Sequence, residues 1–287
     1  MNKRTLACVF LREQVLLEPP RFEALVLKFG GPEFIWDAPP AVLRGCGLLS
    51  NPQVERLLKG RDQAEAISAR LDALSKLGIH TVSCFDDDFP APLLSSFLYP
   101  PSFLYRQGTD GFSGPHLLVA GALQADVPEI AAAVAVGKRL SSLGAVLVST
   151  FAEGVEAAAH VGALSGSGRH KIFLACGHHA ATARDEAVVL AKVAEAGAVY
   201  SEYAPEVEPT AKQRAAASRV ALGAAQGVLV LGEVDAHMEA AVAEAGAAGK
   251  PIFYLVGTEA PVAESLRREG AYPVAGPENL DRILPFL

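Results

Sequence analysis

Hydroxyl, glycine and carboxylate residues follow one predicted strand at the position where α/β proteins bind anions and nucleotides. The segment STFAEGVE runs from Ser149 to Glu156, directly after an apolar run. Ser149 and Thr150 offer hydroxyl groups to a phosphate, and Gly154 lets backbone N–H groups point toward it at the start of a helix. Glu156 is suited to accept a hydrogen bond from a ribose hydroxyl. This segment is the strongest candidate binding turn in the sequence.

A purely structural interpretation of the same segment is equally consistent with the residues. Ser149 and Thr150 are also good helix caps. His160 lies four residues after Glu156, which places both side chains on one face of a helix and allows them to pair. Both interpretations stay open at the level of sequence.

Two further strand ends carry weaker signals. Gly121 ends the apolar run at residues 117–120 and permits a tight turn with close approach of a ligand, although a glycine at a strand end is common. Glu233 follows the strand predicted at residues 228–232, where a carboxylate is suited to a sugar hydroxyl or a base edge. The alternative role for Glu233 is a favourable charge at a helix N-terminus.

Three basic residues precede the strand predicted at residues 228–232. Lys212, Arg214 and Arg219 fall within eight positions of one another, and such a group can hold phosphates. Charged residues at this spacing also commonly form the solvated face of a helix. We therefore treat them as a candidate nucleic-acid contact.

Composition restricts the class of protein. The formal net charge of −7 argues against a broad basic coat for nucleic acid, although a local groove can coexist with it. The four cysteines lie far apart, which is typical of free thiols in a reduced cytosol. Cys176-Gly-His-His offers too few ligands for a metal site. With no apolar run of membrane-spanning length and no signal peptide, we expect a cytoplasmic protein without membrane contact, metal or cofactor.

Periodicity predicts two domains. Residues 1–76 show helical spacing broken by proline and glycine pairs, and residues 77–287 alternate strand and helix. Alternation of this kind favours an α/β fold with a doubly wound, mostly parallel sheet. Strands are expected at residues 116–120, 145–149, 171–175, 198–201, 228–232 and 252–256, with alanine-rich helices at 181–196 and 238–248.

The chain resembles the DNA-processing protein A (DprA/Smf) family along most of its length. The resemblance is carried by FEALVLKFGGPEFIWDAPPAVLRGCGL, by GIHTVSCFDDDFPAPLLSSFLYPPSFLYRQG, and by the later segments AHVGALSGSG, LACG, GAVYSEY, QGVLVLGE, GKPIFYLVG and REGAYPV, in the family's order. It implies a small N-terminal helical domain of the SAM or helix-hairpin-helix kind, followed by an extended Rossmann-like domain. It also implies binding of single-stranded DNA, loading of a RecA-type recombinase during natural transformation, and a homodimer.

Several positions depart from the family's pattern. Its V-G-S-R turn is Ala-Gly-Ala-Leu at residues 120–123, and its R-N-R is Ala-Ser-Arg at residues 217–219. Glu153 stands where a basic residue is common, and we expect no winged-helix domain after the Rossmann-like part. Losing arginines and gaining a carboxylate should weaken single-strand binding and flatten its salt dependence.

The sequence therefore supports one leading function and two alternatives. The leading one is a DprA-like protein that handles single-stranded DNA without catalysis. One alternative is a nucleotide-binding protein on the same fold, either a ligand sensor or an N-glycosidic hydrolase, that has lost DNA binding. Another is a protein that has lost its ligand and acts as an interaction partner through its alanine-rich helices.

Overall fold

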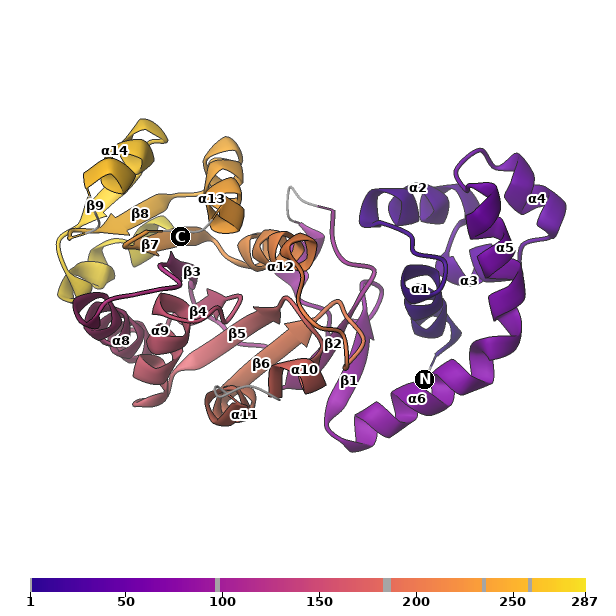
Figure 1. Ribbon diagram of the computed structural model, residues 1–287, viewed down its shortest axis with the longest axis horizontal. Helices are drawn as coiled ribbons and strands as arrows, with labels where there is room; N and C mark the ends of the chain where they lie inside the picture. The colour runs from indigo at the N-terminus through magenta and orange to yellow at the C-terminus, as the bar shows by residue number, and fades with distance from the viewer. Residues whose placement is uncertain (1, 96–98, 183–186, 234–235, 258–259) are drawn as a thin grey trace. The chain divides into compact units, whose positions relative to one another are not determined.

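The computed structural model describes residues 2–95, 99–182, 187–233, 236–257 and 260–287. The chain forms two compact units (Figure 1). The first contains Met1–Leu94 and Tyr99–Arg106, and the second contains Gln107–Leu287. Each unit has its own hydrophobic core.

Short helices build most of the first unit, as the helical spacing predicts. Proline occupies the first turn of four of them, where its missing N–H costs nothing and its fixed φ favours the helix. The elements in chain order are α1 (Lys3–Glu13), α2 (Pro19–Phe29), α3 (Pro32–Asp37), α4 (Pro40–Gly45), α5 (Asn51–Gly60), η1 (Arg61–Gln63), α6 (Ala64–Lys76), β1 (Ile79–Ser83), α7 (Ala91–Leu94) and β2 (Phe103–Gly108).

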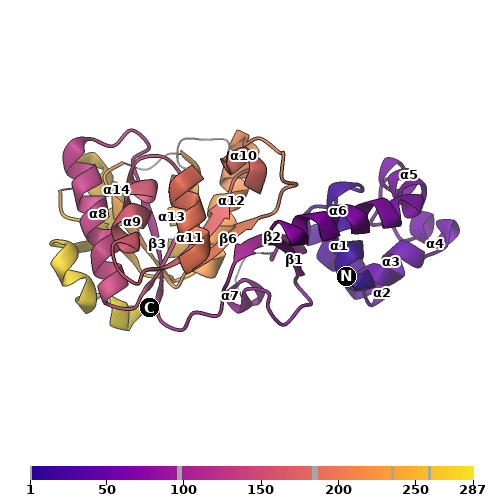
Figure 2. The same cartoon turned by 90° about the horizontal axis from the view of Figure 1, so that it is seen from below.

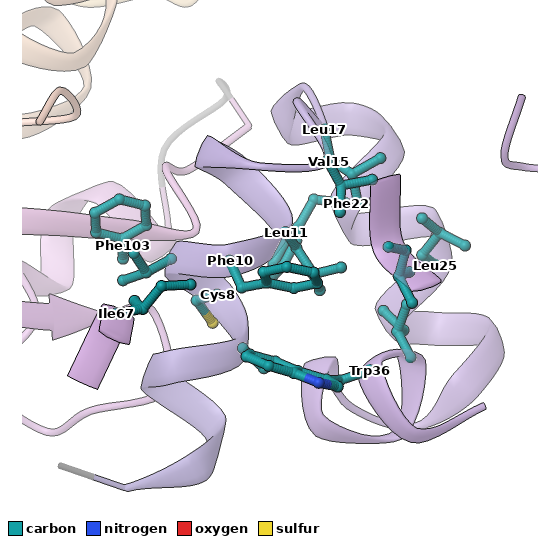
Figure 3. Packing of buried hydrophobic residues seen from close by; sticks show 14 of the residues in the cluster. Cys8, Phe10, Leu11, Val15, Leu17, Phe22, Leu25, Trp36, Ile67 and Phe103 are labelled. Atoms are coloured by element: carbon teal, nitrogen blue, oxygen red, sulfur yellow. The ribbon is translucent and has the colours of Figure 1, made fainter. Parts of the chain in front are cut away.

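The core of this unit is centred on α1 (Figure 3). Phe10 is fully buried, and its ring centroid lies 4.3 Å from that of Trp36. Gly60 ends α5 against the same ring, and a Cβ at this position would lie 2.3 Å from Phe10 Cε2. The glycine therefore lets α5 approach α1 closely.

The first unit extends beyond the boundary expected at residue 76. Ile79 of β1 and Phe103 and Tyr105 of β2 belong to the same hydrophobic cluster as α1. The Tyr105 hydroxyl donates to Glu13 Oε1 at 2.6 Å, which ties β2 to α1. Both strands contribute residues to the core of the helices, which is why this unit continues past residue 76.

Removing the Phe10 ring should destabilise the first unit strongly. We expect Phe10→Ala to lower the free energy of unfolding by about 3–5 kcal/mol, because a fully buried ring leaves a cavity. Phe34→Ala is the matched control, since 54% of Phe34 is exposed, and it should change stability by less than about 0.5 kcal/mol. Urea denaturation followed by circular dichroism measures both; equal effects would contradict the packing described.

A parallel sheet forms the centre of the second unit. Its strands are β3 (His116–Gly121), β4 (Val146–Ser149), β5 (Arg169–Leu174), β6 (Gly197–Ser201), β7 (Gly227–Leu231), β8 (Ile252–Leu255) and β9 (Tyr272–Val274). Within the described residues they lie in the order β6-β5-β4-β3-β7-β8-β9, and each neighbouring pair is parallel. The predicted strands and the Rossmann-like α/β fold are confirmed.

Helices cover both faces of this sheet. In Figure 1, α8 (Val127–Ser142), α9 (Val155–Leu164) and α11 (Ala187–Ala196) lie below the strands, and α12 (Ala211–Ala224) and α13 (Ala236–Ala247) lie above them. The remaining elements are α10 (His178–Thr182), α14 (Ala260–Arg268), η2 (Pro277–Arg282) and η3 (Leu284–Phe286). Residues 183–186 of the helix expected at 181–196 lie outside the described residues.

Two glycines allow α8 and α9 to pack backbone to backbone, and the helices lie side by side in Figure 2. A Cβ at Gly137 would lie 1.8 Å from Ala159 O, and a Cβ at Gly162 would lie 2.0 Å from Val134 O. Any side chain at either position would force the helices apart. This contact fixes α9, which carries Glu156 and His160.

Candidate functional site

The strand order reverses between β3 and β7, which is where α/β sheets of this kind open a crevice for ligands. Gly121 at the end of β3 lies beside Leu231 at the end of β7. A Cβ on Gly121 would lie 2.3 Å from Leu231 O and 2.6 Å from Val155 Cγ1. Gly121 therefore has a packing role at this point, whatever else the crevice holds.

The turns after β3, β4 and β7 touch one another at this edge. Gly154 adopts φ +78°, and a Cβ there would lie 2.2 Å from Ala122 O. A Cβ on Gly232, which has φ +68°, would lie 2.1 Å from Glu129 Oε1. The fold thus brings together three turns that carry candidate residues of the sequence: those of Gly121, of Ser149–Glu156 and of Glu233.

The buried carboxylate of Glu156 holds the turn after β4 in place. Its Oε2 accepts from Thr150 N at 2.9 Å, from Thr150 Oγ1 at 2.9 Å and from Ala152 N at 3.1 Å. Glu156 is only 3% exposed. These donors are of the kind that bind phosphate oxygens in nucleotide sites, so here the chain supplies its own anion.

Other N–H groups of the turn are also engaged within the chain. Phe151 N donates to Ser149 Oγ at 2.8 Å. Val155 N, in the first turn of α9, donates to Ala122 O at 3.1 Å. A phosphate entering this turn would have to displace bonds that the folded chain already makes.

A buried chain of hydrogen bonds leads from Ser149 into the protein. His160 Nε2 lies 2.8 Å from Ser149 Oγ, and His160 Nδ1 lies 2.9 Å from His170 Nδ1. The pairing of Glu156 with His160 is therefore wrong, because both ring nitrogens of His160 have other partners. Ser149 acts as a link between the turn and the core, and its hydroxyl is fully buried.

The contact between the two Nδ1 atoms limits the protons that this chain of hydrogen bonds can hold. If the Ser149 hydroxyl donates to His160 Nε2, His160 Nδ1–H donates to His170 Nδ1, and His170 carries its own proton on Nε2. His170 Nε2 has no hydrogen-bond partner among the described residues. In the reverse arrangement His170 Nδ1–H donates to His160 Nδ1, and His160 Nε2–H donates to the Ser149 hydroxyl oxygen. A second proton between the two Nδ1 atoms would place two N–H groups against each other. His160 and His170 therefore cannot both be charged.

Burial keeps several histidines neutral in the folded protein. It lowers the pKa of His160 well below its usual value, and the neighbouring His170 lowers it further. Burial also lowers the pKa of His170 to about 4 and that of His178 to about 4. His178 Nε2 lies 3.1 Å from Val199 O.

Stability should fall on acidification. Because the unfolded state binds protons below about pH 6.5 and the folded state does not until about pH 4, the free energy of unfolding decreases as pH falls through this window. His170→Gln removes one such group and should reduce the slope by up to about 1.4 kcal/mol per pH unit. His80→Gln, at an exposed position, is the control. Urea denaturation between pH 7.5 and pH 4.5 gives the slope of the free energy of unfolding against pH. An unchanged slope for His170→Gln would contradict a buried, neutral His170.

Carboxylates dominate the open part of the crevice. Glu153 and Glu233 are exposed in the turns after β4 and β7. Glu129 lies over Gly232 and accepts from Asp126 N at 2.9 Å. Residues 121–126, 150–154 and 232–233 contain no arginine or lysine. Anionic ligands are therefore disfavoured at the centre of the crevice and require cations from its margin.

The predicted basic residues lie on α12 and do not form one cluster. At about 100° per residue, Lys212 and Arg219 lie on the same side of the helix, roughly 10 Å apart along its axis. Both are opposite the face that buries Ala217 and Ala221. Arg214 lies about 200° from Lys212 around the helix axis. It is exposed in the first turn of α12, which begins at the carboxyl edge of the strands.

Comparison with known proteins identifies the family. A model of the family described as DNA recombination-mediator protein A matches residues 80–279. The chain belongs to this family. A search of curated protein sequences found no match.

Two solved structures of DNA processing protein A share the fold. The X-ray structure of the protein (DprA) from Streptococcus pneumoniae superposes with a TM-score of 0.77 at 21% identity, covering 99% of this chain and 98% of that chain. The protein from Helicobacter pylori, whose structure is described for its single-stranded DNA binding mode, gives a TM-score of 0.63 at 19% identity, covering 72% of this chain and 95% of that chain.

Two residues that shape the crevice, Glu129 and His170, were not identified from the sequence. Glu129 has a local signal, since Asp126-x-x-Glu129 forms a capping box after the strand that ends at Gly121. His170 has none: it lies on β5, and only the fold brings it to His160. A pairing between residues on a strand and a helix of this kind cannot be recognised from spacing.

The Cys176-Gly-His-His segment is divided between core and surface. Cys176 and His178 are buried, whereas His179 is exposed with Nδ1 3.2 Å from Glu206 Oε1. Within the described residues, no group of three or more histidine, cysteine or acidic side chains is arranged to hold a metal ion. In the same part of the chain, no helix is long and apolar enough to cross a membrane.

Proposed function

We propose that this protein binds single-stranded DNA at the carboxyl edge of its parallel sheet and acts as a DprA-like recombination mediator, without catalysis. Membership of the DNA recombination-mediator protein A family carries the proposal. The likeness to the Helicobacter pylori protein, described as binding single-stranded DNA, supports it.

The charge distribution suggests how a strand would be held. The turns carry carboxylates, and Glu156 occupies the place where a phosphate would bind in this turn. Basic residues at the margin of the crevice therefore hold the DNA backbone. Arg214 is exposed in the first turn of α12, and Lys212 and Arg219 lie on the opposite side of the same helix. Gly121, Ser149, Thr150 and Gly154 shape the turns rather than contact phosphates. We expect weak binding with a shallow salt dependence.

Alanine substitutions on α12 test this assignment. We expect Arg214→Ala to weaken binding of a labelled oligo-dT more than Lys212→Ala or Arg219→Ala, and each lost contact to reduce the salt slope by about 0.7. Lys138→Ala, at an exposed position on α8 on the other face of the sheet, should change nothing. Fluorescence anisotropy at low and at physiological salt measures both quantities. If none of the three substitutions changes the affinity, α12 is not the contact.

A charge reversal in the crevice should strengthen binding. Glu153→Lys removes a carboxylate and adds a phosphate partner on an exposed turn. We expect higher affinity for oligo-dT and a salt slope steeper by about 0.7, because one more counterion is released. Glu195→Lys, at an exposed position of α11, makes the same change in net charge elsewhere. Equal gains in oligo-dT affinity for both variants would mean that the change in net charge, and not the position of residue 153, strengthens binding.

No observation favours the alternative of a nucleotide-binding sensor or N-glycosidic hydrolase in the crevice. The hydrolase form of that hypothesis needs Glu156 and Glu233 as reacting carboxylates. The Oε2 of Glu156 instead accepts three hydrogen bonds from its own turn.

Three further features follow from family membership and stay predictions. We infer that the protein forms a homodimer, that it acts together with a recombinase of the RecA type, and that it is cytoplasmic. The wide separation of the four cysteines in the sequence supports the last of these predictions.

A further inference from the structure

A cavity of about 550 Å³ lies at the edge of the second unit, away from the crevice. It is lined by the start of β8 and by the start of β9 together with η3. Because the strands are parallel, the starts of β8 and β9 mark the opposite edge of the sheet from the strand ends that form the crevice. A volume of this size accommodates a small organic molecule.

Aromatic and aliphatic side chains form most of its lining. Ile252 and Phe253 of β8 are 3% exposed and provide the buried part. Tyr272 and Phe286 also line the cavity, yet they are 64% and 71% exposed. Large exposed rings beside a cavity offer faces on which a planar ligand can stack.

The charged groups of the lining indicate what the ligand carries. Lys250 Nζ donates to Leu222 O and to Ala225 O, each at 2.6 Å, so its ammonium group is bound to the carboxyl end of α12. Burial lowers its pKa to about 8. Glu269 lines the cavity as well, with Oε2 4.0 Å from the position of a Cβ on Gly246.

This combination disfavours an anion. A phosphate would meet the Glu269 carboxylate, and it would have to compete with the carbonyl groups that hold Lys250. A carboxylate beside aromatic rings instead accepts hydrogen bonds from ring N–H, amino or hydroxyl groups of an uncharged molecule. The requirements are a flat ring for stacking and hydrogen-bond donors on its edge.

We propose that the cavity between β8, β9 and η3 binds an uncharged planar heteroaromatic molecule of the nucleobase or nucleoside class, stacked against Tyr272 and Phe286 with its donors toward Glu269. This site is separate from the crevice and does not depend on the function proposed for it.

Ligand-observed saturation-transfer NMR on the full chain tests the proposal. The probes are adenosine, guanosine, thymidine and uridine, with adenosine 5′-monophosphate as the anionic comparison and ribose as the non-planar one. We expect transfer to at least one nucleoside and none to ribose. Tyr272→Ala and Phe286→Ala should each weaken that nucleoside's binding roughly ten-fold, and Glu269→Gln should weaken it as well.

Matched controls separate this site from general surface binding. Phe34→Ala removes a ring of similar exposure from the first unit and should leave nucleoside binding unchanged. The absence of transfer to all four nucleosides, or binding that neither ring substitution changes, would overturn the proposal. Tighter binding of the monophosphate than of adenosine would overturn the uncharged class.

Two variants distinguish failure of this proposal from failure of the function proposed for the crevice. Arg214→Ala should leave nucleoside binding unchanged, and Tyr272→Ala should leave oligo-dT affinity unchanged. If Tyr272→Ala and Phe286→Ala instead weaken oligo-dT without affecting nucleosides, the rings serve the DNA strand and the separate site is rejected.

Discussion

One buried carboxylate organises the edge of the sheet on which function depends. Glu156 accepts three hydrogen bonds from the turn after β4, and that turn contacts the turn after β3 through Gly154. A nucleotide-binding fold usually leaves such donors for its ligand. Here the donors are satisfied from within, so the turn keeps its shape without a bound anion. An anion entering the turn would have to displace hydrogen bonds that the chain already makes.

Electrostatics and packing both disfavour an anion in the turns at this edge of the sheet. The turns carry Glu129, Glu153 and Glu233, and the cations lie on α12. Behind the turn, Ser149, His160 and His170 form a hydrogen-bonded chain, and burial lowers the pKa of both rings so that they stay neutral. The fold of the DNA recombination-mediator protein A family is retained, and the described turns of the crevice offer carboxylates rather than cations to an anion.

Local patterns predicted the fold well and the site only in part. Apolar runs ended by glycine located the parallel strands, because these signals lie within a few residues of one another. The separation of Arg214 from Lys212 and Arg219 followed from helix geometry once α12 was known. The sequence did not predict His170 as the partner of His160. His170 lies on β5, and no residue near it in the sequence indicates the contact. Likewise, β1 and β2 joined the first unit through contacts with α1 that are distant in sequence.

The glycine contact between α8 and α9 has a consequence for how substitutions would be interpreted in genetic screens. Gly137 and Gly162 meet only the backbone of the facing helix, yet they set the position of the helix that carries Glu156. A larger residue at either position would tilt α9 and displace the carboxylate from its donors. Such alleles would be scored as defects in ligand handling even though they alter only the core, and compensating changes would be expected in the facing helix.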